Sequence, residues 1–201
     1  MRRFDRRGLW LWAGRLALGL LLLALPWPGV NAAFVAGYSK LVDALVLDHL
    51  TFGRGGHARL RPALAVETRT DQNVVSDAVI ALRVDGYSDE LKIAMSLRRD
   101  AYLPICVLLA VIAAAPLPWR RRGRALGWGL PAIIALTVVC QWFGILWTFS
   151  QQLAPVMAWG PGPASLIDGL YQALLLPPSN RFVVPLLLGS ALVVLSLSTT
   201  A

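Results

Sequence analysis

Four long apolar segments dominate the pattern of hydrophobic and polar positions along the chain. They cover residues 9–25, 101–119, 125–150 and 182–201. A helix needs about 20 mostly apolar residues to cross a bilayer, and each segment approaches that length. Pro104 falls in the first turn of its predicted helix, where its missing N–H is harmless. The pattern therefore predicts about four transmembrane helices.

Residues 31–100, between the first two apolar segments, show the patterns of a small α+β domain. Apolar positions recur at helical spacing from Phe34 to Val46, which predicts an amphipathic helix over 33–50. Three strand-like pieces follow, at 58–70, 76–84 and 89–98. We expect an antiparallel meander of about three strands. Because such a sheet is marginal alone, the preceding helix is expected to cover its apolar face.

A short helix is also predicted within residues 151–181. Ser165 would cap its N-terminus, and Pro177 and Pro178 would end it. Its apolar side would carry Leu166, Ile167, Leu170 and Leu174. We expect this helix to lie at the membrane interface or to re-enter the membrane.

Composition and charge support a membrane protein and orient it. The 201 residues are 57% hydrophobic and 15% charged, with a mean hydropathy of +0.61, which is too apolar for an ordinary soluble domain. The net charge of +8 comes from residues 1–15 and 119–124, whereas residues 31–100 contain nine basic and nine acidic side chains. The second cluster consists of Arg120, Arg121, Arg122 and Arg124. The positive-inside bias makes both clusters cytoplasmic topology signals.

This orientation predicts the organisation of the whole chain. The expected order begins with a cytoplasmic basic start and first transmembrane helix at 1–30, an external α+β domain at 31–100, and a second transmembrane helix at 101–119. A cytoplasmic basic loop at 120–124 and a third transmembrane helix at 125–150 follow. The chain then forms an external loop with a short helix at 151–181 and a fourth transmembrane helix at 182–201. Both termini would be cytoplasmic. Residues 1–32 also fit a cleavable signal peptide, and that alternative stays open.

The high pI, near 10.5, raises the question of a nucleic-acid partner. The arginine clusters are short, lie next to apolar segments and adjoin tryptophan, which is the pattern of contacts with anionic lipid headgroups. We therefore expect membrane lipids, and no nucleic acid, as partners.

Candidate catalytic and metal-binding residues are few. His49 and His57 flank a glycine-rich turn, but their spacing is not that of a metal site. Cys106 and Cys140 lie in apolar segments away from any histidine, and no G-x-S-x-G elbow is present. We expect no catalytic residue, no metal and no cofactor.

Two groups of residues remain as candidates for contact with a lipid or a partner. Arg54, His57 and Arg59 would lie near the outer membrane surface, where they could face an anionic headgroup. Gln141 and Thr148 are seven residues apart in the third apolar segment, so they share a helix face that could form hydrogen bonds to another helix.

Two short motifs and the layout of the chain resemble a known group of proteins. Tyr102-Leu103-Pro104 opens the second apolar segment, and Gln141-Trp142-Phe143-Gly144 lies in the third. With a helix and β-rich external segment before them, they are similar to the small exosortase-associated membrane proteins of Gram-negative bacteria, in particular those that accompany H-type exosortases. The resemblance implies a multi-pass protein of the bacterial inner membrane that supports a protein-sorting transpeptidase, and it supplies no catalytic residues.

The sequence thus predicts a non-enzymatic accessory protein whose periplasmic domain binds a partner, with an exosortase as one candidate. An alternative is an enzyme or carrier that acts on a lipid-linked or anionic lipid substrate at the outer leaflet, with Arg54, His57 and Arg59 at the headgroup.

Overall fold

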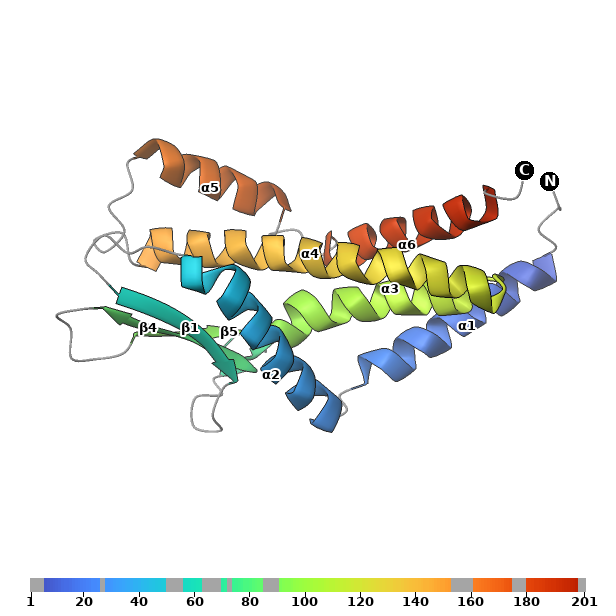
Figure 1. Cartoon of the computed structure of the whole chain (residues 1–201), viewed down its shortest axis with the longest axis horizontal. Coiled ribbons are helices and arrows are strands. Elements are labelled where there is room, and N and C mark those ends of the chain that lie inside the picture. Colours follow the sequence, from blue (N-terminus) through green and yellow to red (C-terminus); the bar gives the residue numbers. More distant parts are fainter. Residues whose placement is uncertain are drawn as a thin grey trace. The chain divides into compact units, whose positions relative to one another are not determined.

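The computed structural model describes residues 6–25, 28–49, 56–62, 70–71, 74–84, 91–152, 161–174 and 180–198 (Figure 1). The chain forms two compact units. Unit 1 comprises Met1–Pro26, Leu103–Leu136 and Pro178–Ala201, and unit 2 comprises Trp27–Tyr102 and Thr137–Pro177.

Unit 1 is a helical bundle built around one short helix. Its elements are α1 (Arg6–Ala24), α3 (Leu103–Ala114), the first half of α4 (Trp119–Gln152) and α6 (Asn180–Ser198). The short helix α3 contacts both α1 and α6 (Figure 1). Leu108 and Ile112 of α3 form a buried core with Ile133 of α4. A side chain at Gly189 would come within 2.9 Å of Val111, so this glycine permits the close approach of α6 and α3.

Unit 2 contains an antiparallel sheet in the order β1-β4-β5. Its strands are β1 (Gly56–Pro62), β4 (Ala78–Val84) and β5 (Leu91–Met95). The predicted three-stranded meander is confirmed. Its first strand is shorter than expected and ends at Pro62, which has no N–H for a ladder. Beyond it, β2 (Thr70–Asp71) and β3 (Val74–Val75) pair as a small separate ribbon that the sequence did not predict.

Helix α2 (Pro28–Leu45) covers one face of this sheet, and the 3₁₀ turn η1 (Leu47–His49) follows it (Figure 1). Val35, Tyr38 and Val42 recur every three or four residues and are buried. Ile80 of β4 and Ile93 of β5 are paired and buried on the covered face. The helix expected at 33–50 is therefore present, but it begins and ends five residues earlier, and it packs on the sheet.

A carboxylate fixes the point where the sheet passes into the helices. Asp77 precedes β4, and its two oxygens accept hydrogen bonds from the backbone N–H groups of Leu97 at 2.6 Å and Arg98 at 2.8 Å. Burial raises the pKa of the Asp77 carboxyl, and these two amide donors oppose that rise. After Leu97 the chain forms a π-helical turn, η3 (Arg98–Tyr102), which runs directly into α3. Asp77 therefore ties the start of the central strand to the junction.

Only two helices are long and apolar enough to cross a membrane, namely the stretches Gly29–His49 and Trp119–Gln151, among the described residues. Trp10–Leu23 and Phe182–Ser196 are shorter apolar stretches. The expected span at 101–119 is a 12-residue helix that ends at Ala114, because Pro116 and Pro118 follow it. The fold is thus mostly helical with a small antiparallel sheet, and the prediction of four spanning helices is supported only in part.

Two local predictions are wrong. The expected basic loop at 120–124 is helical, because α4 begins at Trp119 and the N–H groups of Arg121 and Arg122 bond to the Pro118 carbonyl at 3.0 and 3.1 Å. Ser165 is not a helix cap. Helix α5 (Pro161–Leu174) starts four residues earlier at a proline, which suits the first helical position, and the Ser165 hydroxyl donates to the Gly162 carbonyl at 2.9 Å.

Replacing Asp77 by alanine should loosen the connection between the start of β4 and the turn η3. Two amides lose a charged acceptor, so we expect a loss of about 1–2 kcal/mol in unfolding free energy and roughly tenfold faster amide exchange at Leu97 and Arg98. Hydrogen exchange by mass spectrometry measures this, with the exposed Asp48→Ala as a matched control. Equal exchange in both variants would show that the carboxylate does not hold the junction.

Candidate functional site

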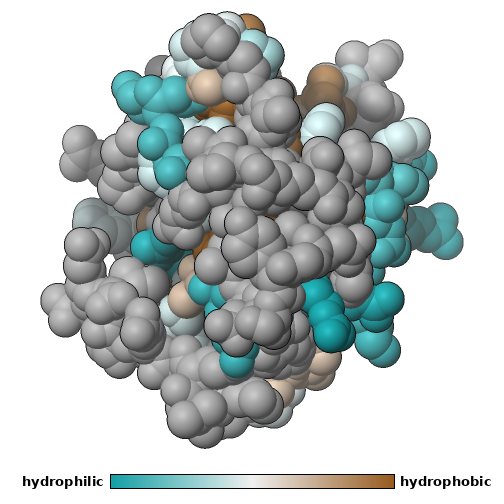
Figure 2. Space-filling model, turned by 90° about the vertical axis from the view of Figure 1, so that its left-hand side faces the viewer, coloured by the Kyte–Doolittle hydropathy of each residue, from teal (hydrophilic) through white to brown (hydrophobic). Residues whose placement is uncertain are grey.

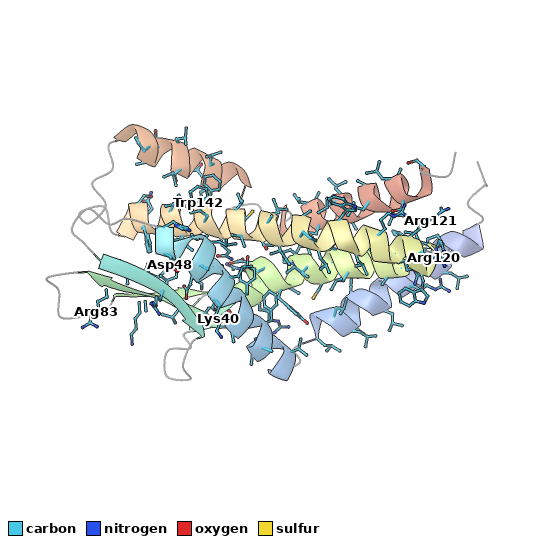
Figure 3. All side chains as sticks on the ribbon, in the orientation of Figure 1. Lys40, Asp48, Arg83, Arg120, Arg121 and Trp142 are labelled. Atoms are coloured by element: carbon cyan, nitrogen blue, oxygen red, sulfur yellow. The ribbon has the colours of Figure 1, made fainter. Side chains whose placement is uncertain are left out.

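The face of the sheet opposite to Ile80 and Ile93 carries basic side chains from all three strands. Arg59 of β1 and Lys92 of β5 both pair with Ala81 of β4, so the two cations flank this alanine in one row. Arg83 follows two residues after Ala81 and therefore lies on the same face. Arg59, Arg83 and Lys92 are exposed, and we call these three residues the basic face. Figure 3 shows Arg83 pointing away from the strands.

The structure describes the three residues predicted to contact a headgroup to different extents. Arg59 belongs to the basic face. His57 lies on β1, where its backbone pairs with that of Arg83, but its side chain lies outside the described residues, as does all of Arg54. The sequence analysis did not select Arg83 and Lys92. The signal was the strand alternation itself, which puts them out of phase with the apolar positions, but only the register shows that they share a face with Arg59.

The described surface of unit 2 is more hydrophilic than its interior. Figure 2 shows hydrophilic residues over much of the coloured surface at the left-hand end of the view in Figure 1. On the basic face, Val79 and Ala81 of the central strand are nevertheless buried, at 2% and 7% exposure. The charged atoms thus stand above a layer of small buried side chains.

Buried polar side chains lie on α2 and on the second half of α4. They are Tyr38 and Ser39 from α2 with Thr137 and Gln141 from α4, each at most 5% exposed. Thr137 is close enough to interact with the Tyr38 hydroxyl, but the two do not form a hydrogen bond of ordinary geometry. The hydroxyls of Tyr38 and Ser39 have no hydrogen-bond partner in the described part of the chain. We call these four residues the polar seam.

The two polar residues predicted to face another helix behave differently. Gln141 is 4% exposed and belongs to the polar seam. The Thr148 hydroxyl instead donates to the Gly144 carbonyl at 2.8 Å, within its own helix. The hydroxyl of Thr148 is therefore engaged by the backbone of α4.

Helix α5 is attached to α4 by an aromatic and carboxylate contact. The Trp147 indole N–H donates to Asp168 Oδ1 at 2.9 Å, and the Trp147 and Tyr171 rings stack with centroids 4.0 Å apart and planes 5° apart. Gln172 donates to the other carboxylate oxygen of Asp168 at 2.9 Å. The sequence analysis missed this group. Asp168, Tyr171 and Gln172 are spaced three and four residues apart on α5, but their partner Trp147 is distant in sequence.

The arginines at the start of α4 have different roles in unit 1. Arg122 donates to the Ala115 carbonyl at 2.9 Å, and its guanidinium lies 5.6 Å from the centroid of the Trp119 ring. This arginine therefore holds the turn between α3 and α4. Arg120 and Arg124 are exposed and Arg121 is half-buried, so these three present positive charge around the beginning of the helix. Figure 3 labels Arg120 and Arg121 there.

The cysteines and histidines do not converge on one place. Cys106 is buried and its thiol donates to the Leu23 carbonyl at 3.5 Å, whereas Cys140 is half-buried and His49 is exposed. Within the described ranges, no group of three or more His, Cys, Asp or Glu is placed to hold a metal ion. The basic face offers positive charge and hydrogen-bond donors, which suit the binding of an anionic surface.

Comparison with known proteins yields no match. No protein-family model matches the chain, and neither does any curated protein or solved structure. The similarity to exosortase-associated proteins therefore rests on the sequence motifs and layout alone.

Removing the Tyr38 hydroxyl should not weaken the fold. Because this buried hydroxyl has no well-formed hydrogen bond, Tyr38→Phe should match the wild type within about 0.5 kcal/mol or be slightly more stable. Tyr38→Ala removes a ring that is 5% exposed and should cost about 3 kcal/mol. Thermal unfolding in detergent checks both variants. A loss of more than about 1 kcal/mol in Tyr38→Phe would show that the hydroxyl is bonded.

Removing the Asp168 carboxylate should free α5 from α4. The Trp147 indole N–H loses its acceptor, so we expect a loss of about 1–2 kcal/mol and faster proteolysis within 161–174. Limited proteolysis and tryptophan fluorescence report on the two helices, with the exposed Ser165→Ala as control. Unchanged cleavage in Asp168→Ala would mean that ring stacking alone holds α5.

Proposed function

We propose that this chain is a non-enzymatic accessory protein of the bacterial inner membrane, whose external domain binds a partner protein. The observation that carries the proposal is the construction of the sheet. One face is sealed by α2, the other presents the basic face, and Asp77 ties the sheet to the junction that leads into α3. A small platform fixed in this way suits docking.

Exposed apolar side chains support a place in the membrane for unit 1. Trp10 and Leu21 of α1 are 77% and 63% exposed, and Leu187 and Leu195 of α6 are 62% and 61% exposed. In water, exposing such an apolar surface costs free energy and favours aggregation. Contact with lipid tails removes this free-energy cost. With α4, which is long and apolar enough to span, these helices fit a membrane-embedded bundle.

Helix α2 passes the same length and composition test, but its charges favour a different role. Lys40 lies near the middle of the stretch Gly29–His49 and is exposed, as Figure 3 shows. If this helix crossed the bilayer, the ammonium would lie near its centre, at a cost of roughly 2.5–3.5 kcal/mol on insertion scales. We therefore place α2 outside the membrane as the cover of the sheet. The sheet and the arginines of 119–124 then lie on opposite sides, in agreement with the positive-inside bias.

The resemblance to exosortase-associated proteins supports a membrane transpeptidase of the exosortase type as the partner. The alternative function, an enzyme or carrier for a lipid-linked anionic substrate at the outer leaflet, draws on Arg59 of the basic face. A lipid substrate and a protein partner give different products on crosslinking, so one experiment separates them.

Chemical crosslinking in native membranes, followed by purification of the tagged full-length chain, should recover a stoichiometric partner protein. Ile80→Asp places a charge at a fully buried position of the central strand, so this variant should remain in the membrane and lose the partner. The exposed substitution Lys40→Ala serves as a matched control. Recovery of a monomer alone from wild-type membranes would contradict the proposal.

A further inference from the structure

We infer that one side of α1 docks against a transmembrane helix of the partner protein, and that Arg15 on this side pairs with an aspartate or glutamate of that helix. The side consists of Leu11, Arg15, Leu18 and Leu22, and we call these four residues the arginine stripe. The inference rests on the proposed function, because it requires unit 1 to lie in the membrane. It goes further, since it adds a contact inside the bilayer to the one made by the external domain.

The arginine stripe is a row of exposed side chains along α1. Its members follow one another at intervals of four, three and four residues, which is the spacing of the contact positions between two helices of a coiled coil. Arg15 is exposed, and the three leucine side chains are between 48% and 63% exposed. The stripe therefore offers a surface along which a second helix could pack.

The contact of α1 with the rest of unit 1 uses a different side of the helix. A side chain at Gly19 would come within 3.5 Å of Ala110, and the Cys106 thiol donates to the Leu23 carbonyl at 3.5 Å. At about 100° per residue, the arginine stripe lies roughly a quarter turn around the helix from Gly19 and Leu23. A helix that docks on the stripe therefore leaves the packing of α1 on α3 in place.

The charge of Arg15 defines the chemistry of the partner helix. A guanidinium stays charged at physiological pH. Arg15 lies five residues after Trp10 and eight before Leu23, the bounds of the apolar stretch of α1, which places it about 8 Å and 12 Å from the two ends. Ionisable side chains at such depth usually pair with one another. A carboxylate offers the full opposite charge and two acceptor oxygens.

The described helices of unit 1 do not supply this carboxylate. Neither α1, α3, α6 nor the first half of α4 contains Asp or Glu, and within the described part of the chain no side chain forms an ion pair with Arg15. Asp5 is the one acidic residue in the sequence of unit 1, and it lies outside the described residues. It is ten positions from Arg15 and within three positions of four other arginines. We therefore assign the carboxylate to the partner.

Other occupants fit the arginine stripe less well. Two copies of the chain inserted in the same orientation would bring their Arg15 side chains together, and like charges repel. Lipid alone would leave the guanidinium to reach for the membrane surface along its own helix. The apolar stretch Trp10–Leu23 is about 21 Å long, shorter than a hydrocarbon core of about 30 Å, and association with other helices is one response to that mismatch.

The first test places a photoreactive benzophenone amino acid at Leu18 of the tagged full-length chain in native membranes. Irradiation should link position 18 to the partner that chemical crosslinking recovers, at a transmembrane helix that contains Asp or Glu. The same amino acid at the exposed Ala17, about 100° around the helix, is the matched control and should give at least about fivefold less product. A link between two copies of this chain, or to a partner helix without an acidic residue, overturns the inference.

The second test removes the charge. Arg15→Leu makes α1 more apolar, so the variant should stay in the membrane while partner recovery falls at least about fivefold. Arg15→Lys keeps a cation and should retain at least about half of the recovery. Arg124→Leu removes an exposed arginine from α4 and should leave recovery unchanged. Undiminished recovery with Arg15→Leu, as for an arginine that only contacts lipid headgroups, overturns the inference while the proposed function stands.

A double-mutant cycle identifies the charge pair. The acidic residue of the partner helix is replaced by leucine, alone and together with Arg15→Leu. Each single change should lower recovery, and the combination should lower it no further, because both remove the same interaction. Losses that multiply overturn the inference. Recovery of no partner from wild-type membranes by either crosslinking method overturns the proposed function, and the inference with it.

Discussion

The structure depends on how a three-stranded sheet hides its apolar face. A sheet of this size is marginal when one apolar face meets water, and α2 removes that face from solvent by packing Val35, Tyr38 and Val42 over it. The opposite side of α2 carries the exposed Lys40, and the opposite face of the sheet carries the exposed Arg59, Arg83 and Lys92.

The helices add a second constraint, which is length. Helix α4 has 34 residues and is about 51 Å long, well beyond the roughly 30 Å of a hydrocarbon core. It contributes its first half to unit 1 and its second half to unit 2, where Thr137 lies near Tyr38 of α2 and Trp147 contacts α5.

Periodicity predicted the local elements well because it reflects burial directly. The alternation before Met95 and the helical spacing from Phe34 to Val46 each identify one covered face. Contacts between distant residues left no such signal. Asp77 reaches backbone 20 residues away, and Trp147 reaches Asp168 over 21 residues. The shared face of Arg59, Arg83 and Lys92 needed the strand register. The cluster of charge at 120–124 led us to predict a loop, but these residues are helical, and arginine is a good helix former.

The central proposal is that the sheet and α2 are external and that the arginines at the start of α4 are cytoplasmic. The most direct measurement labels single cysteines at Lys40, Arg83 and Arg121, in a background without Cys106 and Cys140, with a membrane-impermeant maleimide applied to spheroplasts. The account predicts that positions 40 and 83 react from outside and that position 121 reacts only after permeabilisation. A position 40 that resists labelling on both sides, or a position 83 that behaves like position 121, would contradict it.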